Sequence, residues 1–300
     1  MRAFFCDTYE MPLPPGHRFP LPKYRLLRTR LLEECVLAPH ELEESALIDR
    51  PSLLLAHTPE YLEAVFSGTL PAADQRRLGF AWSDALVARS RASVFGTVAA
   101  ARAALRDGLA GNLAGGTHHA YADRGTGFCV FNDLAVAARA LQREGAIDRA
   151  LVVDLDVHQG DGTAAIFAGD ESVFTFSMHG AKNFPFRKQR SSLDLELADG
   201  CGDAEYLGAL EENLPRAIDR CRPDVLFYQA GVDPLEQDTL GRLDLSLEGL
   251  RLRDRTVALA ARERGIPLLL TLGGGYARPI ELSVEAHAAT WREARSVLGV

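Results

Sequence analysis

Short apolar runs that alternate with helix-like patterns constrain the fold of this chain more than any other feature. Each run is rich in Val, Leu and Phe and is bounded by Gly, Pro or Asp, as buried strands usually are. Segments with apolar residues at helical spacing lie between the runs. This alternation predicts βαβ units and therefore an α/β fold with an open, mainly parallel sheet and helices on both faces. We expect strands at 3–6, at 113–115 or slightly earlier, and at 150–156, 173–178, 224–231 and 266–275, and helices at 84–108, 132–145, 247–265 and 281–298.

The composition fits one globular unit. Of the 300 residues, 47% are hydrophobic and 25% are charged, which is typical of a chain that can bury a sizeable core. No internal repeat, Ser/Gly linker or change in composition divides the chain, so we expect a single domain over residues 1–300. The five cysteines are widely scattered without a CxxC pair, which argues against a disulfide framework and against a thiolate zinc site.

Charge and hydropathy restrict the partners and the location. The formal net charge of −8 argues against nucleic acid or an anionic membrane as the main partner, although the RKQR segment at 187–190 is compatible with a local basic patch. No apolar run is long enough to span a membrane, and the N-terminus becomes polar too soon for a signal peptide. We therefore expect no membrane partner and a cytoplasmic location, whereas the sequence leaves the oligomeric state open.

The stretch LVVDLDVHQGDGT at 151–163 carries an unusual amount of charge directly after a predicted buried strand. Open parallel sheets bind ligands beyond the carboxyl ends of their strands. Three other clusters also follow predicted strands, namely GGTHHA at 115–120, QAGVDPL at 229–235 and LGGGYA at 272–277. We expect the four strand ends to meet at one edge of the sheet. They would then bring together His118, His119, Asp154, Asp156, His158, Asp161, Asp233 and Tyr276.

Each cluster has a simpler interpretation when it is taken alone. An isolated Asp-x-His is common by chance, paired histidines often lie in surface loops, and an Asp before Pro often starts a turn. Tyr276 is compatible with a half-buried core position, and the glycines at 273–275 lack the spacing of a dinucleotide-binding loop. The functional interpretation rests on the coincidence of all four clusters at one edge of a sheet.

Three of these residues have the chemistry of a metal site. Asp156, His158 and Asp233 would neutralise a divalent cation and leave a coordination position open, as catalytic zinc requires. Fe²⁺ is an alternative ion, because the ligands are hard oxygen and borderline nitrogen. A metal with an open position can polarise an amide or ester carbonyl and lower the pKa of water, which points to hydrolysis.

The remaining polar residues of these four clusters can transfer protons and stabilise an oxyanion, as a hydrolase requires. His118 and His119 can take a proton from water and return one to a leaving nitrogen, provided that carboxylates orient their rings. Asp154 and Asp161 are the candidates for that role. Tyr276 can donate a hydrogen bond to the oxyanion of a tetrahedral intermediate.

Six motifs together resemble the zinc-dependent histone deacetylases of the arginase/deacetylase superfamily. They are GGTHHA, GTGFCVFND at 125–133, VVDLDVHQGDGT, SMH at 177–179, AGVDPL and LGGGY, in the family's order and spread over most of the chain. The glutamine in DVHQGDG and the segment at 184–197 are most similar to the bacterial class IV members. The resemblance implies one deacetylase domain that removes acetyl or longer acyl groups from lysine side chains or similar amines.

The resemblance also implies the roles of individual catalytic residues. The implied zinc ligands are Asp156, His158 and Asp233. The implied proton-transfer pair is His118, backed by Asp154, and His119, backed by the less buried Asp161. Tyr276 would be the transition-state tyrosine.

Substrate and potassium sites follow from the same resemblance. Phe128 would line an acyl-lysine tunnel, Phe184 would form its opposite wall, and Gly127 and Gly274 would lie beside the substrate. A structural K⁺ ion is also implied. Its ligands would be Asp154, Asp156 and main-chain oxygens near His158, Ser177 and Met178.

Two positions separate the chain from the arginase pattern. Binuclear arginases place another Asp two positions after the His of D-x-H and pair two aspartates on the later strand. This chain has Gly160 and Leu235 at those positions. A second catalytic metal would therefore lack ligands, and mononuclear zinc chemistry is favoured over a manganese ureohydrolase.

The sequence leaves the substrate open between acylated lysine in a protein or peptide and an acylated small amine such as an acetylpolyamine. His17 and Tyr24, in a segment at 12–24 that resembles the family's rim loop, are candidates either for substrate contact or for packing against the first helix. A rival interpretation is a non-catalytic metal-binding homologue. The histidine pair and Tyr276 argue against it, because a scaffold needs no proton shuttle.

Overall fold

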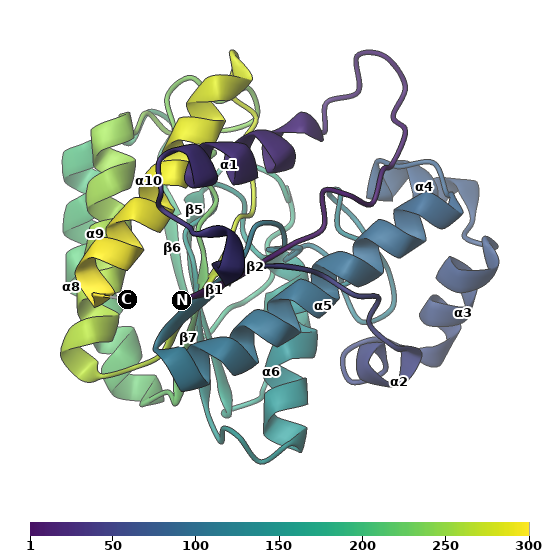
Figure 1. Ribbon diagram of the computed structural model, residues 1–300, viewed down its shortest axis with the longest axis horizontal. Coiled ribbons are helices and arrows are strands. Elements are labelled where there is room, and N and C mark those ends of the chain that lie inside the picture. Colours follow the sequence, from purple (N-terminus) through teal and green to yellow (C-terminus); the bar gives the residue numbers. More distant parts are fainter. Residues whose placement is uncertain (300) are drawn as a thin grey trace.

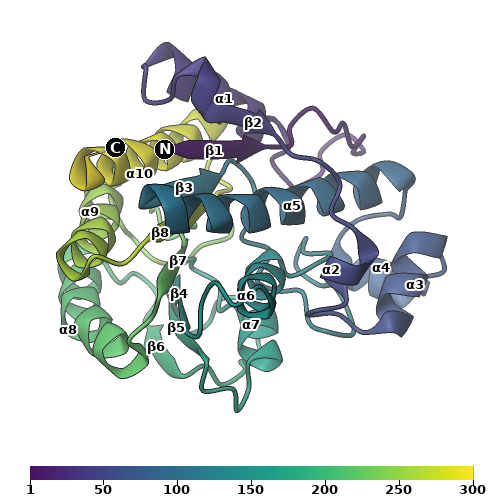
Figure 2. The ribbon, with the colours of Figure 1, turned by 60° about the horizontal axis from the view of Figure 1, so that its bottom comes forward.

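One parallel sheet forms the centre of the protein in a computed structural model that describes residues 1–299. The strand order is β2-β1-β3-β8-β7-β4-β5-β6, and every neighbouring pair is parallel (Figures 1 and 2). The open parallel sheet expected from the sequence is therefore confirmed. The strands are β1 (Arg2–Phe5), β2 (Leu42–Glu44), β3 (Leu109–Asn112), β4 (Ala150–Asp154), β5 (Val173–Gly180), β6 (Leu193–Leu197), β7 (Val225–Gln229) and β8 (Leu268–Thr271).

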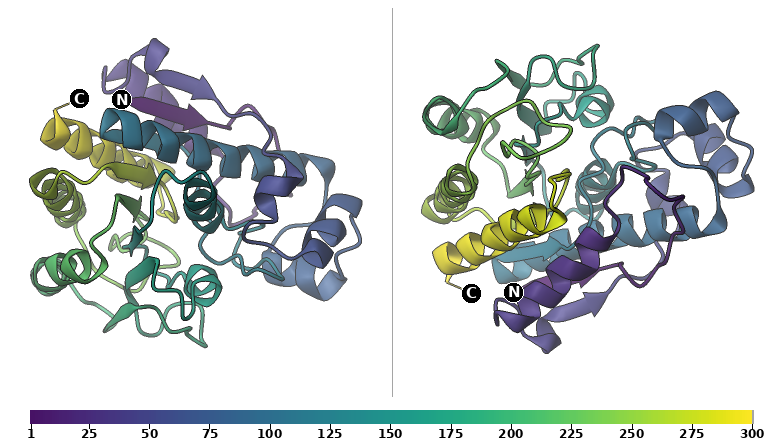
Figure 3. Two further views of the ribbon diagram at one scale, coloured as in Figure 1. Left: turned by 90° about the horizontal axis from the view of Figure 1, so that it is seen from below. Right: turned by 90° about the horizontal axis from the view of Figure 1, so that it is seen from above.

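Helices cover both faces of the sheet. α1, α8, α9 and α10 pack on one face, and α5 and α6 pack on the other, with α2, α3 and α4 grouped near the start of α5 (Figures 1 and 3). The helices are α1 (Pro22–Glu33), α2 (Arg50–Leu53), α3 (Pro59–Ser67), α4 (Ala72–Leu78), α5 (Asp84–Asp107), α6 (Asp133–Arg143), α7 (Asp161–Ile166), α8 (Asp203–Cys221), α9 (Leu247–Arg264) and α10 (Ile280–Leu298). Within residues 1–299, no helix combines the length and the apolar character needed to cross a membrane.

Alternate residues of the central strands fill two separate cores. In β4, Leu151 and Val153 belong to the core beneath α8, α9 and α10, whereas Ala150 and Val152 belong to the core beneath α5 and α6. Successive side chains of a strand point to opposite faces, so a strand covered on both sides must be apolar at every position. This explains why β4 is a continuous apolar run in the sequence.

The two edge strands and the helices α1 to α4, α7 and α8 are not among the elements predicted from the sequence. β2 and β6 lie at the two edges of the sheet and are only partly buried, so they carry charged residues instead of an apolar run. α8 buries an apolar stripe at helical spacing that includes Tyr206, Leu210 and Leu214. The strand expected near 113–115 lies slightly earlier, at Leu109–Asn112.

The four clusters singled out in the sequence follow four neighbouring strands. The neighbouring strands β3, β8, β7 and β4 run in the same direction (Figure 2). The loops that follow them therefore all begin at the carboxyl ends of the strands, on one side of the sheet. The site is built where these loops meet.

Candidate active site

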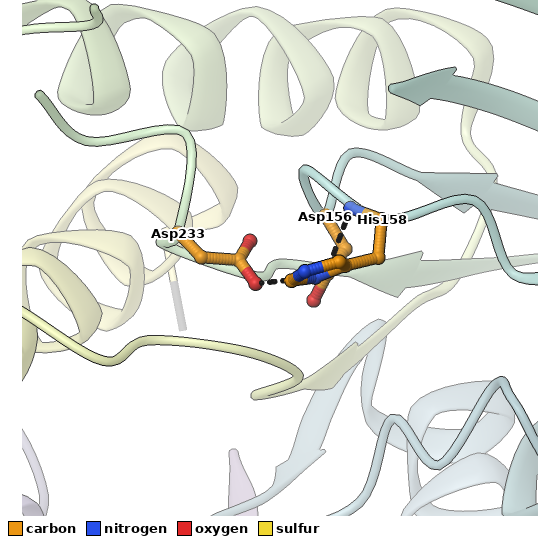
Figure 4. Close-up of side chains that lie close together, drawn as sticks. All are labelled: Asp156, His158 and Asp233. Atoms are coloured by element: carbon orange, nitrogen blue, oxygen red, sulfur yellow. Dashed lines mark hydrogen bonds and ion pairs between the residues drawn. The ribbon is translucent and has the colours of Figure 1, made fainter. Parts of the chain in front are cut away.

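Three potential metal ligands meet beyond the ends of β4 and β7. Asp156 and His158 follow β4, and Asp233 follows β7. All three are buried, and one ligand atom of each lies within 4.8 Å of the others. The Nδ1 atom of His158 is 3.0 Å from an oxygen of Asp156 and 3.0 Å from an oxygen of Asp233 (Figure 4).

Main-chain amides hold both carboxylates in this arrangement. The amide of Gly274 donates a hydrogen bond of 2.7 Å to Asp156, and the amide of Val157 donates one of 2.8 Å to Asp233. In each carboxylate the other oxygen faces His158. Only glycine fits at position 274, because a Cβ atom there would lie 1.9 Å from a carboxylate oxygen of Asp233.

The electrostatics of this group favour a bound cation. Burial and the neighbouring carboxylate of Asp156 raise the pKa of Asp233 to about 7, which shows that negative charge is crowded here. The Nδ1 atom of His158 carries at most one hydrogen and cannot donate to both carboxylates at once. A cation would instead accept a lone pair from each of the three side chains. The donor set therefore fits a divalent metal ion.

Among residues 1–299, no second group of this kind is present. A Cβ atom at Gly160 would lie 2.3 Å from a carboxylate oxygen of Asp154 and 3.2 Å from His118, so a side chain has no space there. Leu235 is buried in the apolar core. Neither of the positions that distinguish this chain from the arginase pattern can supply a ligand.

His118 and His119 lie side by side next to the metal-ligand group. They follow β3, and their ring centroids are 4.2 Å apart. The Nδ1 atom of His118 is hydrogen bonded to Asp154 at 2.7 Å, and that of His119 is hydrogen bonded to Asp161 at 2.6 Å. Each ring is thus oriented by its own aspartate, as the sequence suggested. The second nitrogen, Nε2, is left for other contacts, and in His118 it lies 3.9 Å from Asp156.

The two histidines have opposite pKa shifts. Burial disfavours the charged form of His118, but the carboxylates of Asp154 and Asp156 outweigh burial and raise the pKa to about 9. Burial and the neighbouring His118 lower the pKa of His119 to about 4. Solvent exposure does not separate the two aspartates, because Asp161 and Asp154 are both 3% exposed. The second carboxylate beside His118 distinguishes the two rings instead.

Tyr276 follows β8 and lines the same pocket as both histidines. Its amide donates to Asp238 at 2.6 Å and its carbonyl accepts from Thr239 at 2.8 Å, so the main chain is fixed on both sides. The ammonium of Lys23 lies 5.7 Å from the centre of the tyrosine ring. Burial and the charge of Asp233 hold the pKa of Tyr276 well above 10, so its hydroxyl stays protonated and can donate a hydrogen bond.

Comparison with known proteins decides the family. Residues 17–291 match the family model of the histone deacetylase domain. This chain belongs to the histone deacetylase family. It is 48% identical over 293 residues to an uncharacterized protein of Picosynechococcus, with 98% of each chain covered. It is 34% identical over 262 residues to histone deacetylase 2 of Arabidopsis thaliana, covering 81% of this chain and 68% of that protein.

Solved structures of HDAC homologs share the fold over almost the whole chain. The HDAC homolog from Aquifex aeolicus matches with a TM-score of 0.83 and 26% identity, covering 99% of this chain and 88% of that chain. An HDAC homolog complexed with SAHA matches with a TM-score of 0.82 and 27% identity, again over 99% and 88%. The arginase/deacetylase-like fold is therefore confirmed.

The four residues predicted to bind substrate lie around the histidine pair and the metal-ligand group. Phe184 packs edge-on against His119 with ring centroids 4.9 Å apart, and Phe128 lines the same pocket. Gly127 has a positive φ of 56°, and a Cβ atom there would lie 2.6 Å from the ring of His119. Gly274 contacts the carboxylates of the metal-ligand group. Substrate contact by these residues stays a prediction.

His17 and Tyr24, the other two candidates for substrate contact, lie at different depths. His17 is half-buried at the pocket mouth, where its Nε2 atom is 2.9 Å from the carbonyl of Gly79. Tyr24 is buried beneath the guanidinium of Arg89, 4.7 Å from the ring centre, and lines the inner part of the pocket. Of these two, only His17 lies at the rim.

The residues predicted to bind K⁺ lie at and beyond the ends of two adjacent strands. Asp154 of β4 is the register partner of Ser177 in β5, and Met178 follows it. Asp156 and His158 lie just beyond β4. All five are buried. The potassium ion itself stays a prediction.

A buried ion pair beneath the site was not predicted. Arg253 of α9 is fully buried, and its Nη1 atom donates to the carbonyls of Leu155 and Gly231 at 3.2 and 2.6 Å. These carbonyls belong to the two loops that carry the metal-ligand group. Asp254, 2.7 Å from the guanidinium, balances the charge and also accepts a hydrogen bond from Thr290. One buried cation therefore ties the two ligand loops together.

Removal of one carboxylate should abolish metal binding. Elemental analysis should return one transition-metal ion per chain for the wild type and none for Asp233→Ala, because two ligands hold an ion far more weakly than three. Asp244→Ala, which changes an exposed aspartate of the following loop, should keep the ion and serves as the control. Two transition-metal ions per wild-type chain would contradict the mononuclear site.

Proposed function

We propose that this protein is a zinc-dependent amide hydrolase that removes acetyl or longer acyl groups from lysine side chains or similar amines. The observation that carries the proposal is the pair of aspartate-bound histidines beside a buried three-ligand group, in a pocket that both histidines, Asp156, His158 and Tyr276 line. Membership of the histone deacetylase family supports it, as does the similar HDAC homolog solved with SAHA. Zinc held by Asp156, His158 and Asp233 would polarise an amide carbonyl and lower the pKa of water, and Fe²⁺ is the alternative ion.

His119 is the proposed general base and general acid. Its lowered pKa keeps the ring neutral near pH 7, and its Nδ1 atom is held by Asp161, so Nε2 can accept the proton of the attacking water. The same nitrogen atom then gives that proton to the leaving nitrogen as the carbon–nitrogen bond breaks. The products are a free amine and a carboxylic acid, which then loses its proton to the solvent. His118 acts chiefly through its charge, which Asp154 supports.

Tyr276 is the proposed donor to the oxyanion. Attack of water on the amide carbon places a negative charge on the former carbonyl oxygen, and a protonated phenol in the same pocket can donate a hydrogen bond to it. A structural K⁺ ion near Asp154 and Ser177 is proposed on the resemblance of the motifs and on the pairing of these two residues in the sheet.

Two alternatives differ from this proposal in substrate or in chemistry. An acylated small amine such as an acetylpolyamine is the alternative substrate, because the chemistry of the pocket is the same for any amide. A non-catalytic metal-binding homologue needs neither histidine pair nor phenol. The presence of Tyr276 and of two histidines that are each hydrogen bonded to an aspartate argues against it.

A hydrolysis assay tests the proposed activity. Acetyl-lysine and longer acyl-lysine peptides should be hydrolysed by the metal-loaded protein, and a chelator should abolish turnover until zinc is restored. An acetylated polyamine serves as the small-molecule arm of the assay. Absence of hydrolysis of every substrate by protein with a full complement of zinc would support the non-catalytic interpretation and contradict the proposal.

Loss of His119 should slow turnover without removing the metal. His119→Ala deletes the proposed proton carrier, so kcat should fall by roughly two to four orders of magnitude, the usual contribution of a positioned acid–base group. His40→Ala removes an exposed histidine outside the pocket and should leave kcat unchanged. Near wild-type turnover of His119→Ala would show that the proton takes another route.

Loss of the Tyr276 hydroxyl should affect kcat much more than KM. Tyr276→Phe keeps the ring and deletes a donor that acts only once the oxyanion has formed, so kcat should fall on the order of a hundredfold or more. Zinc content and KM should barely change, and Tyr9→Phe, which removes a hydroxyl outside the pocket, should leave both kinetic constants unchanged. An unchanged kcat would mean that Tyr276 is structural, and loss of zinc would mean that its turn shapes the metal site.

A further inference from the structure

Basic side chains line the mouth of the pocket, although the chain as a whole is acidic. The lining of the mouth includes Arg18, Arg76, Arg77, Lys182 and Arg242, and within residues 1–299 no Asp or Glu is part of it. We call these five residues the basic rim. The whole chain has a net charge of −8, so the basic rim is opposite in sign to the protein that carries it.

The fold assembles the basic rim from four separate segments. Arg18 precedes α1, Arg76 and Arg77 lie in α4, Lys182 follows β5, and Arg242 lies between β7 and α9. All five residues are exposed. The same mouth also reaches His119, His158 and Tyr276, so the charge lies directly in front of the proposed site.

Carboxylates neutralise only part of the basic rim. Arg77 pairs with a neighbouring aspartate of α4, whereas Lys182 and Arg242 share the single carboxylate of Asp199, each at 3.5 Å. The other two arginines of the rim form no ion pair in the part of the chain that the structure describes. Positive charge is therefore left over at the mouth.

Two neighbouring features extend the surface around the basic rim. The loop at 182–190 contains four basic residues and no acidic one, and its Phe186 is 84% exposed at the mouth. A groove between α4 and residues 11–17 is lined mainly by apolar residues, together with His17, Gln75, Arg76 and Ser83. Such a surface has positive charge to attract an acidic chain and apolar contacts to hold it.

We propose that the basic rim selects acylated lysines that are flanked by acidic residues in a peptide or protein. The inference rests on the proposed hydrolase function and names its substrate class. Coulomb attraction between the rim and flanking carboxylates raises the encounter rate and lowers KM. A lysine-rich tail or a cationic polyamine meets repulsion at the same mouth.

Three acetyl-lysine peptides that differ only in their flanking residues test the proposal. With Glu, Gln or Lys on both sides, kcat/KM at low salt should be highest for Glu, by roughly three- to tenfold over Gln, and lowest for Lys. The differences should shrink at about 0.5 M salt, which screens exposed charges. Equal values for the three peptides, or a preference for Lys, would overturn the proposal. Failure to hydrolyse any of the three, with an acetyl and with a longer acyl group alike, would contradict the proposed function instead.

Charge-neutralising variants assign the preference to the rim. The double variant Arg18→Gln and Arg76→Gln should lose most of the preference for Glu, so that kcat/KM of the Glu peptide falls toward that of the Gln peptide. As a control, Arg106→Gln removes a positive charge near the end of α5, close to the start of β3 and away from the carboxyl ends of the strands. This variant should keep the preference for Glu. A preference that survives in the double variant, or that Arg106→Gln weakens as much, would overturn the role of the basic rim.

Discussion

Buried negative charge at the ends of β4 and β7 is the constraint on which the site depends. Asp154, Asp156 and Asp233 are each at most 3% exposed, and buried carboxylates are unstable unless hydrogen bonds or cations compensate them. The protein supplies part of this compensation through main-chain amides and through His118 and His158. Burial and the charge of Asp156 raise the pKa of Asp233, so a bound cation would add to this compensation.

The scaffold holds this charge in place from both sides of the sheet. Parallel strands direct four loops to one edge, and apolar cores on both faces keep those strands in register. Beneath the loops, Arg253 donates hydrogen bonds to the main-chain carbonyls that precede Asp156 and Asp233, and Asp254 balances the charge of the guanidinium. The proposed chemistry and the proposed selection of acidic substrates thus use different parts of the surface. The negative charge lies deep in the pocket, and the positive charge lies at its mouth.

The fold and the composition of the site could be predicted because both depend on local patterns. Continuous apolar runs are typical of strands that helices cover on both faces. Such runs come just before Asp156, His158 and Asp233, so a parallel sheet brings these three residues together at the carboxyl ends of its strands. Arg253 was missed because the segment LRLRDR has the composition of an exposed helix surface. Arg253 lies three residues after the buried Leu250, and this spacing places both residues on the inner face of α9. The spacing does not show which carbonyl groups the guanidinium contacts. The basic rim could not be predicted, since its residues are far apart in the sequence.

Thermal unfolding of the metal-free protein, with and without zinc, tests the central claim most directly. Zinc that binds the folded chain and compensates its buried carboxylates must raise the midpoint temperature of unfolding, and the rise must grow with zinc concentration. At a hundredfold excess of zinc over Kd, binding adds about 2.7 kcal/mol to the free energy of unfolding. Asp233→Asn should show little of this response, because it removes one charged ligand without changing the shape of the side chain. An unchanged midpoint in the wild type, or an equal rise in the variant, would contradict the claim that these carboxylates form a cation site.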